Sequence, residues 1–358
     1  MKAPGLKSLY IILAFLLFSH TPTMAAWFPI QVDIWDPPFN KDRTRYQTKY
    51  SPLEKAAKKW RICVSIPHLK DPYFIAVNFG LIDEAKRLGV RLNLYEAGGY
   101  NNLDVQRRQI SECMEGGSDG LIVSAISESG LNDLVKKFEQ RGQPVVDMIN
   151  GMSSPDISAK AAVDFWDTGY QAGMYLNKLL TNQKKSITVA WFPGPKGAAW
   201  VNAGNDGFNK ATVNDKITVV ATRYGDTGRS AQGKLIIEVL DKYPKLDVIV
   251  GTSVTAEAAV EILRRRGLVN KIKVLSYYYS PGVHKGIRRG SITAAPSDLQ
   301  AIQARIAVDT MVRILEKKKY FKHVAPQVMV VDRKNIRTFD SSTSLPPRGF
   351  RPIFSINE

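Results

Sequence analysis

The sequence predicts an α/β protein with two doubly wound parallel-sheet lobes that are joined by a three-crossing hinge. From Trp60 onward, short apolar strands alternate with segments of helix length. Repeated strand–helix units of this kind form parallel sheets with right-handed crossovers. The alternating run is too long for one compact sheet, and polar stretches rich in Gly, Ser and Pro interrupt it. We therefore expect two lobes with a cleft between them.

The expected strands are short and apolar, and glycines often end the helical segments between them, as at Gly89, Gly142 and Gly290. A glycine directly after an amphipathic segment is a typical helix stop. The expected strands are residues 61–65, 91–95, 120–123, 144–148, 186–192, 217–222, 248–251, 273–278 and 292–295.

The lobe boundaries follow from the polar breaks in the pattern. A polar stretch after residues 148–151 indicates the passage from the first lobe to the second, and the turn at 279–282 and the segment 320–326 indicate two more crossings. The predicted first lobe is residues 60–155 plus 283–319, and the predicted second lobe is residues 156–282 plus 320–358. Residues 27–59 have no clear period, so we expect an extended arm that lies over the surface or is held for a partner.

Residues 1–26 have the features of an export signal. Lys2 and Lys7 precede an apolar run over residues 9–18, and small residues before Trp27 suit cleavage. We therefore expect the mature protein in the periplasm. No later segment has the 18 or more apolar residues that a membrane-spanning helix requires.

The chain is strongly basic, with a formal charge of +17. A basic balance often indicates a nucleic-acid partner. This chain, however, has an export signal and neither a helix-turn-helix segment nor zinc-ligand spacing, so the sequence gives little support to a nucleic-acid-binding protein. We therefore expect no nucleic acid. The positive residues are scattered along helix faces. They predict a solvated basic surface with some attraction to an anionic membrane or an acidic partner.

The motifs of common enzymes and cofactor sites are absent from the sequence. There is no Gly-x-Ser-x-Gly elbow and no cysteine–histidine nucleophile pair, and the glycine-rich residues 193–197 lack the spacing of a phosphate loop. The four histidines form no ligand cluster, so we expect no metal and no cofactor. The sequence favours a binding protein over an enzyme.

The chain has two cysteines, Cys63 and Cys113. Outside the cytoplasm an even pair is a disulfide candidate, and two cysteines permit a single connectivity. We expect a structural bridge at the end of the first lobe that faces away from the cleft.

Two adjacent aromatic residues, Tyr73 and Phe74, follow the first strand of the alternating pattern. In an open α/β sheet, the loops at the carboxyl ends of the strands line the crevice where ligands bind. These two rings are therefore candidates for ligand contact. The alternative is that they are ordinary core aromatics.

The order of strand, residues 70–74, helix and a later Ser297-Asp298 resembles the type I periplasmic binding proteins of the ribose-binding class. Within that class the chain is similar to the TorT group, periplasmic receptors for trimethylamine N-oxide that work with the sensor kinase TorS. The two cysteines also fall where that group carries cysteines. The matching segments are residues 96–100, 148–150, 169–171, 192–195, 250–252, 256–259, 276–278 and 348–352.

This resemblance implies a ligand in the cleft and assigns residues to it. Ribose-type proteins hold sugar hydroxyls with charged and amide side chains. Here the corresponding positions carry Ile149, Asn150, Thr252, Ser253 and Tyr278, and aromatic faces attract a methylated cation instead. The expected ligand contacts are Phe74, Tyr100, Tyr278, and Phe165 or Trp166, with Asn150 as a donor to the oxide oxygen and with Tyr73, Trp200 and Asp298 as second choices.

Each of these residues has a structural alternative. Tyr100 would only end a turn, Trp166 would point into the core of the second lobe, and Asp298 would cap the helix that follows it. With the resemblance, the sequence predicts a receptor that closes on trimethylamine N-oxide, or on a related methylated amine oxide, and signals to a membrane sensor histidine kinase. The alternative function is the sugar-binding component of an ABC importer, which would have the same fold.

Overall fold

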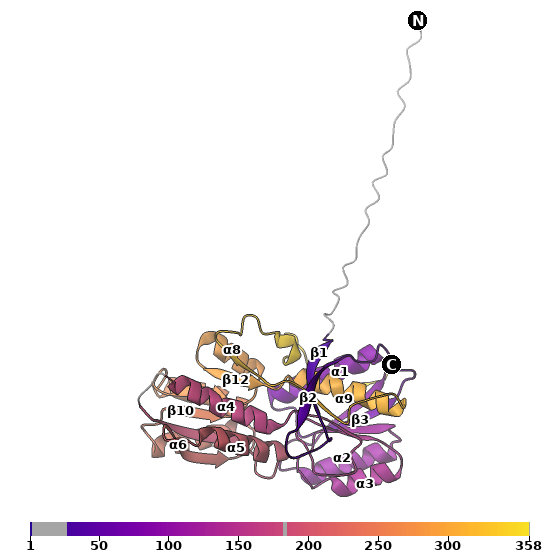
Figure 1. Ribbon diagram of the computed structural model, residues 1–358, viewed down its shortest axis with the longest axis horizontal. Helices are drawn as coiled ribbons and strands as arrows, with labels where there is room; N and C mark the ends of the chain where they lie inside the picture. The colour runs from indigo at the N-terminus through magenta and orange to yellow at the C-terminus, as the bar shows by residue number, and fades with distance from the viewer. Residues whose placement is uncertain (2–26, 182–184, 358) are drawn as a thin grey trace.

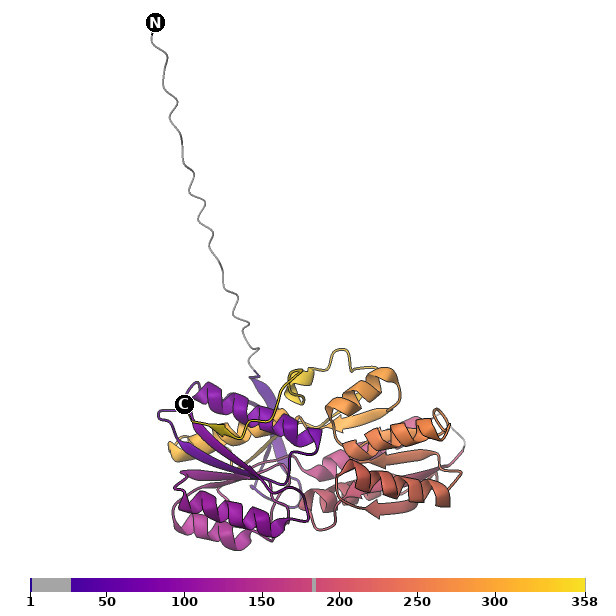
Figure 2. The same ribbon diagram turned by 180° about the vertical axis from the view of Figure 1, so that it is seen from behind.

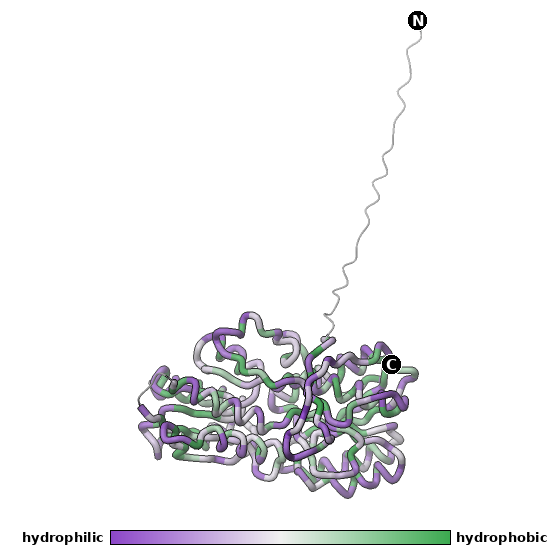
Figure 3. Tube along the Cα trace, in the orientation of Figure 1, coloured by the Kyte–Doolittle hydropathy of each residue, from purple (hydrophilic) through white to green (hydrophobic). Residues whose placement is uncertain are grey.

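The structure, a computed structural model, describes Met1 and residues 27–181 and 185–357. The expected export signal, residues 1–26, lies outside this part of the chain except for its first residue. Figure 1 shows two α/β lobes side by side, and Figure 2 shows the same lobes from behind. In Figure 3, apolar stretches run through the interior of both lobes, while hydrophilic stretches lie along the outer loops and helices.

The first lobe is built on a large, mostly parallel sheet. Within the described residues its strand order is β15-β4-β3-β5-β6-β7-β13-β1-β2. Helices α1 and α9 cover one face, and α2 and α3 cover the other (Figure 1). The bounds are β3 (Arg61–Ile66), α1 (Pro72–Leu88), β4 (Arg91–Glu96), α2 (Leu103–Glu115), β5 (Gly120–Val123), α3 (Asn132–Gln140), β6 (Val145–Met148), β7 (Ala159–Ala161), α9 (Gln300–Leu315), β13 (His323–Pro326) and β15 (Ser355–Ile356).

The second lobe holds a parallel sheet of order β11-β10-β8-β9 and a separate antiparallel pair, β12-β14. Helices α4 and α5 pack against each other, as do α6 and α7. The two lobes confirm the predicted fold class. The bounds are α4 (Phe165–Leu180), β8 (Ile187–Gly194), α5 (Ala199–Thr212), β9 (Ile217–Tyr224), α6 (Arg229–Lys242), β10 (Val248–Gly251), α7 (Ser253–Arg265), β11 (Lys273–Ser276), α8 (Pro281–Arg289), β12 (Ala294–Ser297), β14 (Met329–Asp332) and a short 3₁₀ helix, η1 (Ser341–Thr343).

The lobe crossings differ from those that the sequence predicts. The chain does not leave the first sheet after residue 151, because β7 pairs in parallel with β6 and with β13. It enters the second lobe only at α4. The return is also later than predicted, since α8 packs on α7 and β12 contacts β11, which leaves residues 281–297 with the second lobe. The predicted assignment of residues 320–358 to the second lobe is wrong in part, because β13 and β15 pair within the sheet of the first lobe. Strand β7 has three residues, too few for a clear alternation of apolar and polar side chains.

Several predicted strands end one or two residues from the predicted position, and two of these differences lie near the cleft. Strand β11 ends at Ser276 instead of residue 278, because the Ser276 hydroxyl donates to the carbonyl of Tyr278 and the chain turns there. Strand β12 lies at Ala294–Ser297, two residues after the predicted 292–295. Both differences lie close to the cleft, where the backbone leaves the sheet.

Residues 27–59 are not an arm laid over the surface. They form a hairpin of β1 (Ile30–Trp35) and β2 (Arg45–Tyr50), and β1 pairs antiparallel with β13. Val32 and Ile34 alternate in the sequence with the polar Gln31 and Asp33, which is the period of a strand, and residues 32–35 are all buried. We refer to β1, β2 and the loop between them as the N-terminal hairpin.

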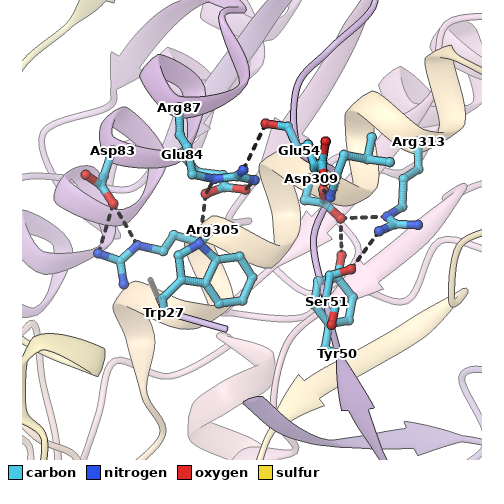
Figure 4. Close-up of polar contacts among 11 residues, drawn as sticks. Trp27, Tyr50, Ser51, Glu54, Asp83, Glu84, Arg87, Arg305, Asp309 and Arg313 are labelled. Atoms are coloured by element: carbon cyan, nitrogen blue, oxygen red, sulfur yellow. Dashed lines mark hydrogen bonds and ion pairs between the residues drawn. The ribbon is translucent and has the colours of Figure 1, made fainter. Parts of the chain in front are cut away.

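Polar contacts fix the start of this segment to helix α1. The indole N–H of Trp27 donates to Glu84 Oε2 at 2.9 Å, and Arg87 pairs with the same carboxylate. Burial raises the pKa of Glu84, while the hydrogen bond and the charge of Arg87 lower it. Figure 4 shows this contact beside the second anchor of the segment.

The second anchor is the buried carboxylate of Asp309 on α9. It accepts hydrogen bonds from the Tyr50 hydroxyl and, at 2.7 Å, from the backbone N–H of Leu53. Arg313, one turn further along α9, pairs with it at 2.7 Å and donates to the carbonyl of Ser51 at 2.8 Å (Figure 4). The end of the hairpin is therefore held by a satisfied, buried polar network.

Cys63 on β3 and Cys113 on α2 form a disulfide in this structure, with their Cα atoms 5.9 Å apart. The bridge joins a central strand to the helix that covers it. No helix among the described residues is both long and apolar enough to cross a bilayer.

Candidate functional site

A small cavity lies between the two lobes. Its lining is almost entirely buried and mostly aromatic. The enclosed space, counted with its open mouth, is about 270 Å³. Much of this space is open solvent at the mouth, so the closed cavity has room only for a compact molecule. The lining residues are His68, Asp71, Tyr73, Phe74, Tyr100, Ile149, Asn150, Phe165, Trp200, Thr227 and Tyr278.

The topology brings these residues together. The first lobe contributes the segments that follow β3, β4 and β6, and the second lobe contributes the starts of α4 and α5 and the segments that follow β9 and β11. All are connections at the carboxyl ends of parallel strands, or the first turns of the helices that follow. In both lobes these ends face the cleft, as open α/β sheets place their ligand sites.

Asp71 is central to the polar geometry of the cavity. Its side chain caps α1, because Oδ1 accepts from the backbone N–H of Tyr73 at 2.9 Å, and Pro72 supplies a favourable first helical residue. Its Oδ2 accepts from the Tyr278 hydroxyl of the second lobe at 2.9 Å. Burial raises the pKa of Asp71 to about 6, although both hydrogen bonds lower it. The cavity thus holds a carboxyl group that is ionised at neutral pH.

The aromatic rings surround the cavity from both lobes and meet at steep angles. Tyr73 and Tyr278 have ring centroids 5.2 Å apart at an interplanar angle of 72°. The centroid of the Trp200 ring lies 5.9 Å from that of Tyr100 and 5.8 Å from that of Phe165. Such edge-to-face and tilted contacts are the favoured packing of aromatic side chains. They hold the rings in fixed positions around the cavity.

Asn150 positions Tyr100. Its side-chain N–H groups donate to the Tyr100 hydroxyl at 3.0 Å and to the carbonyl of Ala125 at 2.8 Å. The amide therefore has no N–H left for a ligand, which differs from the donor role predicted for it. The Tyr100 oxygen is an acceptor in this contact, so its own proton is available, and no acceptor for it is found within the described residues.

Trp200 provides a second available donor. Its side chain is 4% exposed, and its indole N–H forms no hydrogen bond of good geometry within the described residues, although a weak contact with the Tyr100 hydroxyl lowers the pKa of that tyrosine. A buried donor without a partner destabilises the folded protein, because it has given up its hydrogen bonds to water. The Trp200 ring neighbours that of Tyr100. The cavity therefore offers two adjacent donors without an acceptor.

His68 is a cavity residue that the sequence analysis missed. Its Nε2 lies 3.1 Å from the hydroxyl of Thr227 in the second lobe, and its Nδ1 has no partner among the described residues. Burial and, to a smaller extent, the charge of Lys70 lower the pKa of His68 to about 4. The imidazole is therefore neutral at neutral pH.

Further contacts cross the cleft around the cavity. Lys70 of the first lobe pairs with Asp226 of the second at 2.5 Å. On another side, Asn202 of α5 donates to Glu128 of the first lobe at 3.4 Å. The structure therefore describes a closed arrangement of the lobes.

The comparisons with known proteins agree with this geometry. Residues 62–319 match a family model described as a periplasmic binding protein domain. This chain belongs to the periplasmic binding protein family. Proteins of this family bind solutes and are not catalysts.

Three relatives of this binding protein are informative. The periplasmic protein TorT of Escherichia coli K12 is 32% identical over 87% of this chain and 90% of its own length. A crystal structure of an ABC transporter solute binding protein from Bradyrhizobium sp. BTAi1 with bound Bis-Tris is 48% identical, with a TM-score of 0.81, and covers 93% of this chain and 100% of that one. In the crystal structure of the TorS sensor domain–TorT complex in the presence of TMAO, the matching chain is 29% identical to this one, with a TM-score of 0.76. The match covers 83% of this chain and 100% of that chain.

Most residues predicted for the site of this binding protein line one cavity, but Trp166 and Asp298 do not. Trp166 stacks on Tyr170 with centroids 4.6 Å apart and lies under the guanidinium of Arg43, so of the two alternatives on α4 it is Phe165 that faces the cavity. The Tyr73 hydroxyl donates a hydrogen bond to Asp298 Oδ2, so Asp298 positions that ring without lining the cavity itself.

Four further lining residues, His68, Asp71, Ile149 and Thr227, were not among the predicted contacts. Asp71 had a sequence signal, since Asp before Pro at a helix start is a typical cap. His68 and Thr227 had none, because their proximity depends on how the two lobes meet. Within the described residues, no cluster of three metal-ligating side chains is present.

Proposed function

We propose that this periplasmic binding protein is a receptor for trimethylamine N-oxide or a closely related methylated amine oxide, and that it reports occupancy to the periplasmic domain of a membrane sensor histidine kinase. The observation that carries the proposal is the combination of an aromatic cavity, one buried carboxyl group and two donors without acceptors.

The aromatic rings and Asp71 suit the positive end of such a ligand. The methyl groups of a quaternary nitrogen carry its charge, and each aromatic face attracts that charge by roughly 0.5 to 2 kcal/mol. An ionised carboxylate in the same cavity adds a full negative charge at low dielectric. A sugar would gain little from these groups, because its hydroxyls require several placed donors and acceptors.

The oxide oxygen suits the other side of the cavity. It accepts hydrogen bonds and donates none, so it matches the hydroxyl of Tyr100 and the indole N–H of Trp200. Binding would satisfy a buried donor that otherwise has no partner. One ligand would then use the rings, the carboxylate and both donors.

Closure couples ligand binding to a signal. Tyr73 and Tyr100 come from the first lobe, whereas Trp200 and Tyr278 come from the second, so a ligand that contacts all four favours the closed arrangement. The surface that a partner meets then differs between the two states. The similarity to TorT, which forms a complex with the TorS sensor domain, supports a kinase as that partner.

The alternative is an importer component, and the Bradyrhizobium relative gives it a specific basis because that protein is described as an ABC transporter solute binding protein. Its bound Bis-Tris is an amine that also carries hydroxyl groups. This ligand supports an amine-binding cavity and leaves room for a hydroxylated substrate. Ligand titration separates the two functions.

The test is calorimetric titration of the mature protein with trimethylamine N-oxide, trimethylamine, Bis-Tris and ribose. We expect saturable binding of trimethylamine N-oxide, weaker binding of trimethylamine because it lacks the oxygen, and no measurable heat with ribose. Saturable ribose binding without amine-oxide binding would show the proposal to be wrong. Preferential binding of Bis-Tris would favour the importer alternative.

A further inference from the structure

A group of cationic side chains surrounds a hollow on the outer surface of the second lobe. Arg288 lies on α8, and Arg333, Lys334 and Arg337 lie on the segment that follows β14. Figures 1 and 2 show α8 and this segment, in orange and yellow, side by side at the same edge of the lobe. The hollow between them, counted with the solvent that fills it, is about 1,210 Å³. We call it the basic groove.

The cations of the basic groove have no counter-charges. All four side chains are exposed, and none forms an ion pair with any residue that the structure describes. Some exposed arginines elsewhere on the same lobe do form ion pairs: Arg229 pairs with Glu261 at 2.5 Å, and Arg266 pairs with Asp241 at 2.6 Å. The basic groove is distinctive because four cations without an ion pair to the described residues line one hollow.

The nearest acidic residues along the chain form hydrogen bonds elsewhere and do not line the groove. Asp332 is buried and accepts from the hydroxyl of Tyr175 at 3.1 Å. Asp340 caps η1, because its carboxylate accepts from the backbone N–H and the hydroxyl of Ser342. A concave surface lined by charges of one sign concentrates the potential of that sign. The groove thus attracts anions.

The floor of the groove is apolar. Ile336 is buried, and Phe339 is half-buried and packs its ring 5.4 Å from that of Tyr279. A hollow with cations at its rim and apolar side chains at its base fits a peptide that carries carboxylates beside an apolar residue. A flat membrane surface would contact the rim and leave the base unfilled. We propose that the basic groove binds an acidic segment of a partner protein.

The groove is linked to the ligand cavity through adjacent residues of the chain. His284, which also lines the groove, is 2.7 Å from the hydroxyl of Tyr279. Tyr279 is the neighbour of the cavity residue Tyr278, and Ser280 caps α8 directly after it. A segment bound in the groove therefore touches the helix that begins three residues after the cavity wall. The proposal itself does not depend on which ligand the cavity holds.

The test uses the full mature protein and a fluorescein-labelled peptide of glutamates around one central leucine. Fluorescence anisotropy should show saturable binding that weakens with added salt, because exposed charges are screened. The variant Arg288→Glu/Arg333→Glu/Arg337→Glu should bind about tenfold or more weakly, since three attractions become repulsions. A matched control, Lys136→Glu/Lys137→Glu/Arg141→Glu, changes three exposed cations on and beside α3 of the other lobe and should bind as the unmodified protein does.

Circular dichroism verifies that each variant is folded. If the glutamate variant is not folded, a variant with glutamine at the same three arginines removes the positive charges without adding negative ones. Equal loss of binding in the groove variant and in the α3 control would overturn the proposal, because it would reveal attraction by net charge alone. Displacement of the peptide by inorganic phosphate, but not by chloride of equal ionic strength, would show a small-anion site instead. Groove-dependent binding to phosphatidylglycerol vesicles without peptide binding would show a membrane surface instead.

Discussion

Single residues give the cavity its chemistry, and Tyr278 combines two roles. Its ring lies among those of Tyr73 and Trp200, and its hydroxyl donates to Asp71 across the cleft. Tyr278→Ala should weaken binding of trimethylamine N-oxide by at least 0.5 to 2 kcal/mol, roughly the value of one cation–π face. Tyr278→Phe keeps the face and should lose about 1 kcal/mol through the missing hydrogen bond.

Titration calorimetry and thermal melting of both Tyr278 variants separate a ligand contact from a packing role. Tyr278 is 4% exposed, so the alanine variant should also melt at a lower temperature. An unchanged dissociation constant in the folded fraction of Tyr278→Ala would contradict its placement at the ligand.

Asp71 predicts how ligand binding depends on pH. Its pKa is raised to about 6, so the carboxyl is ionised above that pH and protonated below it. A ligand with a positive end binds the ionised form better, and its affinity should therefore fall as the pH drops through 6. His68, whose pKa is lowered to about 4, stays neutral over this range and adds no opposing change.

Calorimetric titrations with trimethylamine N-oxide between pH 5 and 8 measure this dependence. Burial also raises the pKa of Asp298, which accepts a hydrogen bond from Tyr73, to about 6. Asp71→Asn should therefore bind more weakly than the unmodified protein at pH 8 and should show a smaller change near pH 6. A pH profile that is the same in both proteins would rule out the carboxylate as its source.

At the scale of elements, the N-terminal hairpin links the two lobes. It belongs to the sheet of the first lobe, yet Arg43 and Arg45 pair with Asp164 and Asp167 at the start of α4, each at 2.6 Å. Helix α4 begins with Phe165, a cavity residue. The hairpin therefore restrains the helix that carries part of the ligand site.

Removing both arginines tests this restraint. These partly exposed pairs contribute about 1 kcal/mol or less each to stability, so Arg43→Ala/Arg45→Ala should stay folded. Stopped-flow measurements should show faster dissociation of trimethylamine N-oxide, since opening of the lobes is less opposed. The control is Arg107→Ala, which removes an ion pair with Asp133 inside one lobe and should leave the rate unchanged. Equal rates in all three proteins would assign the hairpin a purely structural role.

The disulfide is a second link between elements. Cys63 and Cys113 are separated by 50 positions, and closing a loop of that length stabilises a fold by about 4 kcal/mol in the chain-entropy description. Mass spectrometry of exported, non-reduced protein should find the bridge, and reductant should lower the melting temperature. The melting temperature of Cys63→Ser/Cys113→Ser should not respond to reductant. Two freely alkylated thiols in native material would contradict the pairing.

The elements also show what the sequence could and could not predict. Long alternating units were predictable, and strands such as Gly120–Val123 lie where their apolar runs indicated. Strand β7 was not, because its three residues acquire strand geometry only from β6 and β13 on either side. The N-terminal hairpin did have a signal, the alternation around Val32, but its partner strand is far away in the sequence.

The same reasoning applies to the site. Tyr73 and Phe74 were predictable because they follow a strand at its carboxyl end. Phe165 could not be separated from Trp166, since one residue of helix phase decides which of them faces the cavity. The His68–Thr227 contact required knowledge of how the lobes close, which no local pattern contains.

At the scale of the whole molecule, the proposed function requires closure of the lobes, and the ion pair of Lys70 with Asp226, which crosses the cleft, offers a way to test it. Small-angle scattering should show a contraction when trimethylamine N-oxide is added. Both side chains are partly exposed, so Lys70→Gln should remove about 1 kcal/mol or less and raise the ligand concentration needed for contraction by up to about fivefold. Lys136→Gln, at an exposed site on α3, is the matched control. Identical contraction curves for the two variants would show that the pair does not stabilise closure.

The order of strands in the first sheet has a consequence for biogenesis. Strand β13 separates β7 from the N-terminal hairpin, and β15 completes the opposite edge of the same sheet, although both strands lie near the end of the chain. Almost the whole second lobe, by contrast, is one continuous segment. During vectorial export the hairpin emerges first but has no strand to pair with until residues 323–326 follow. The four-stranded sheet of the second lobe, residues 187–276, can therefore form while the chain is still being translocated, whereas the pair β12-β14 and the sheet of the first lobe are completed only when residues 329–332 and 355–356 have crossed the membrane.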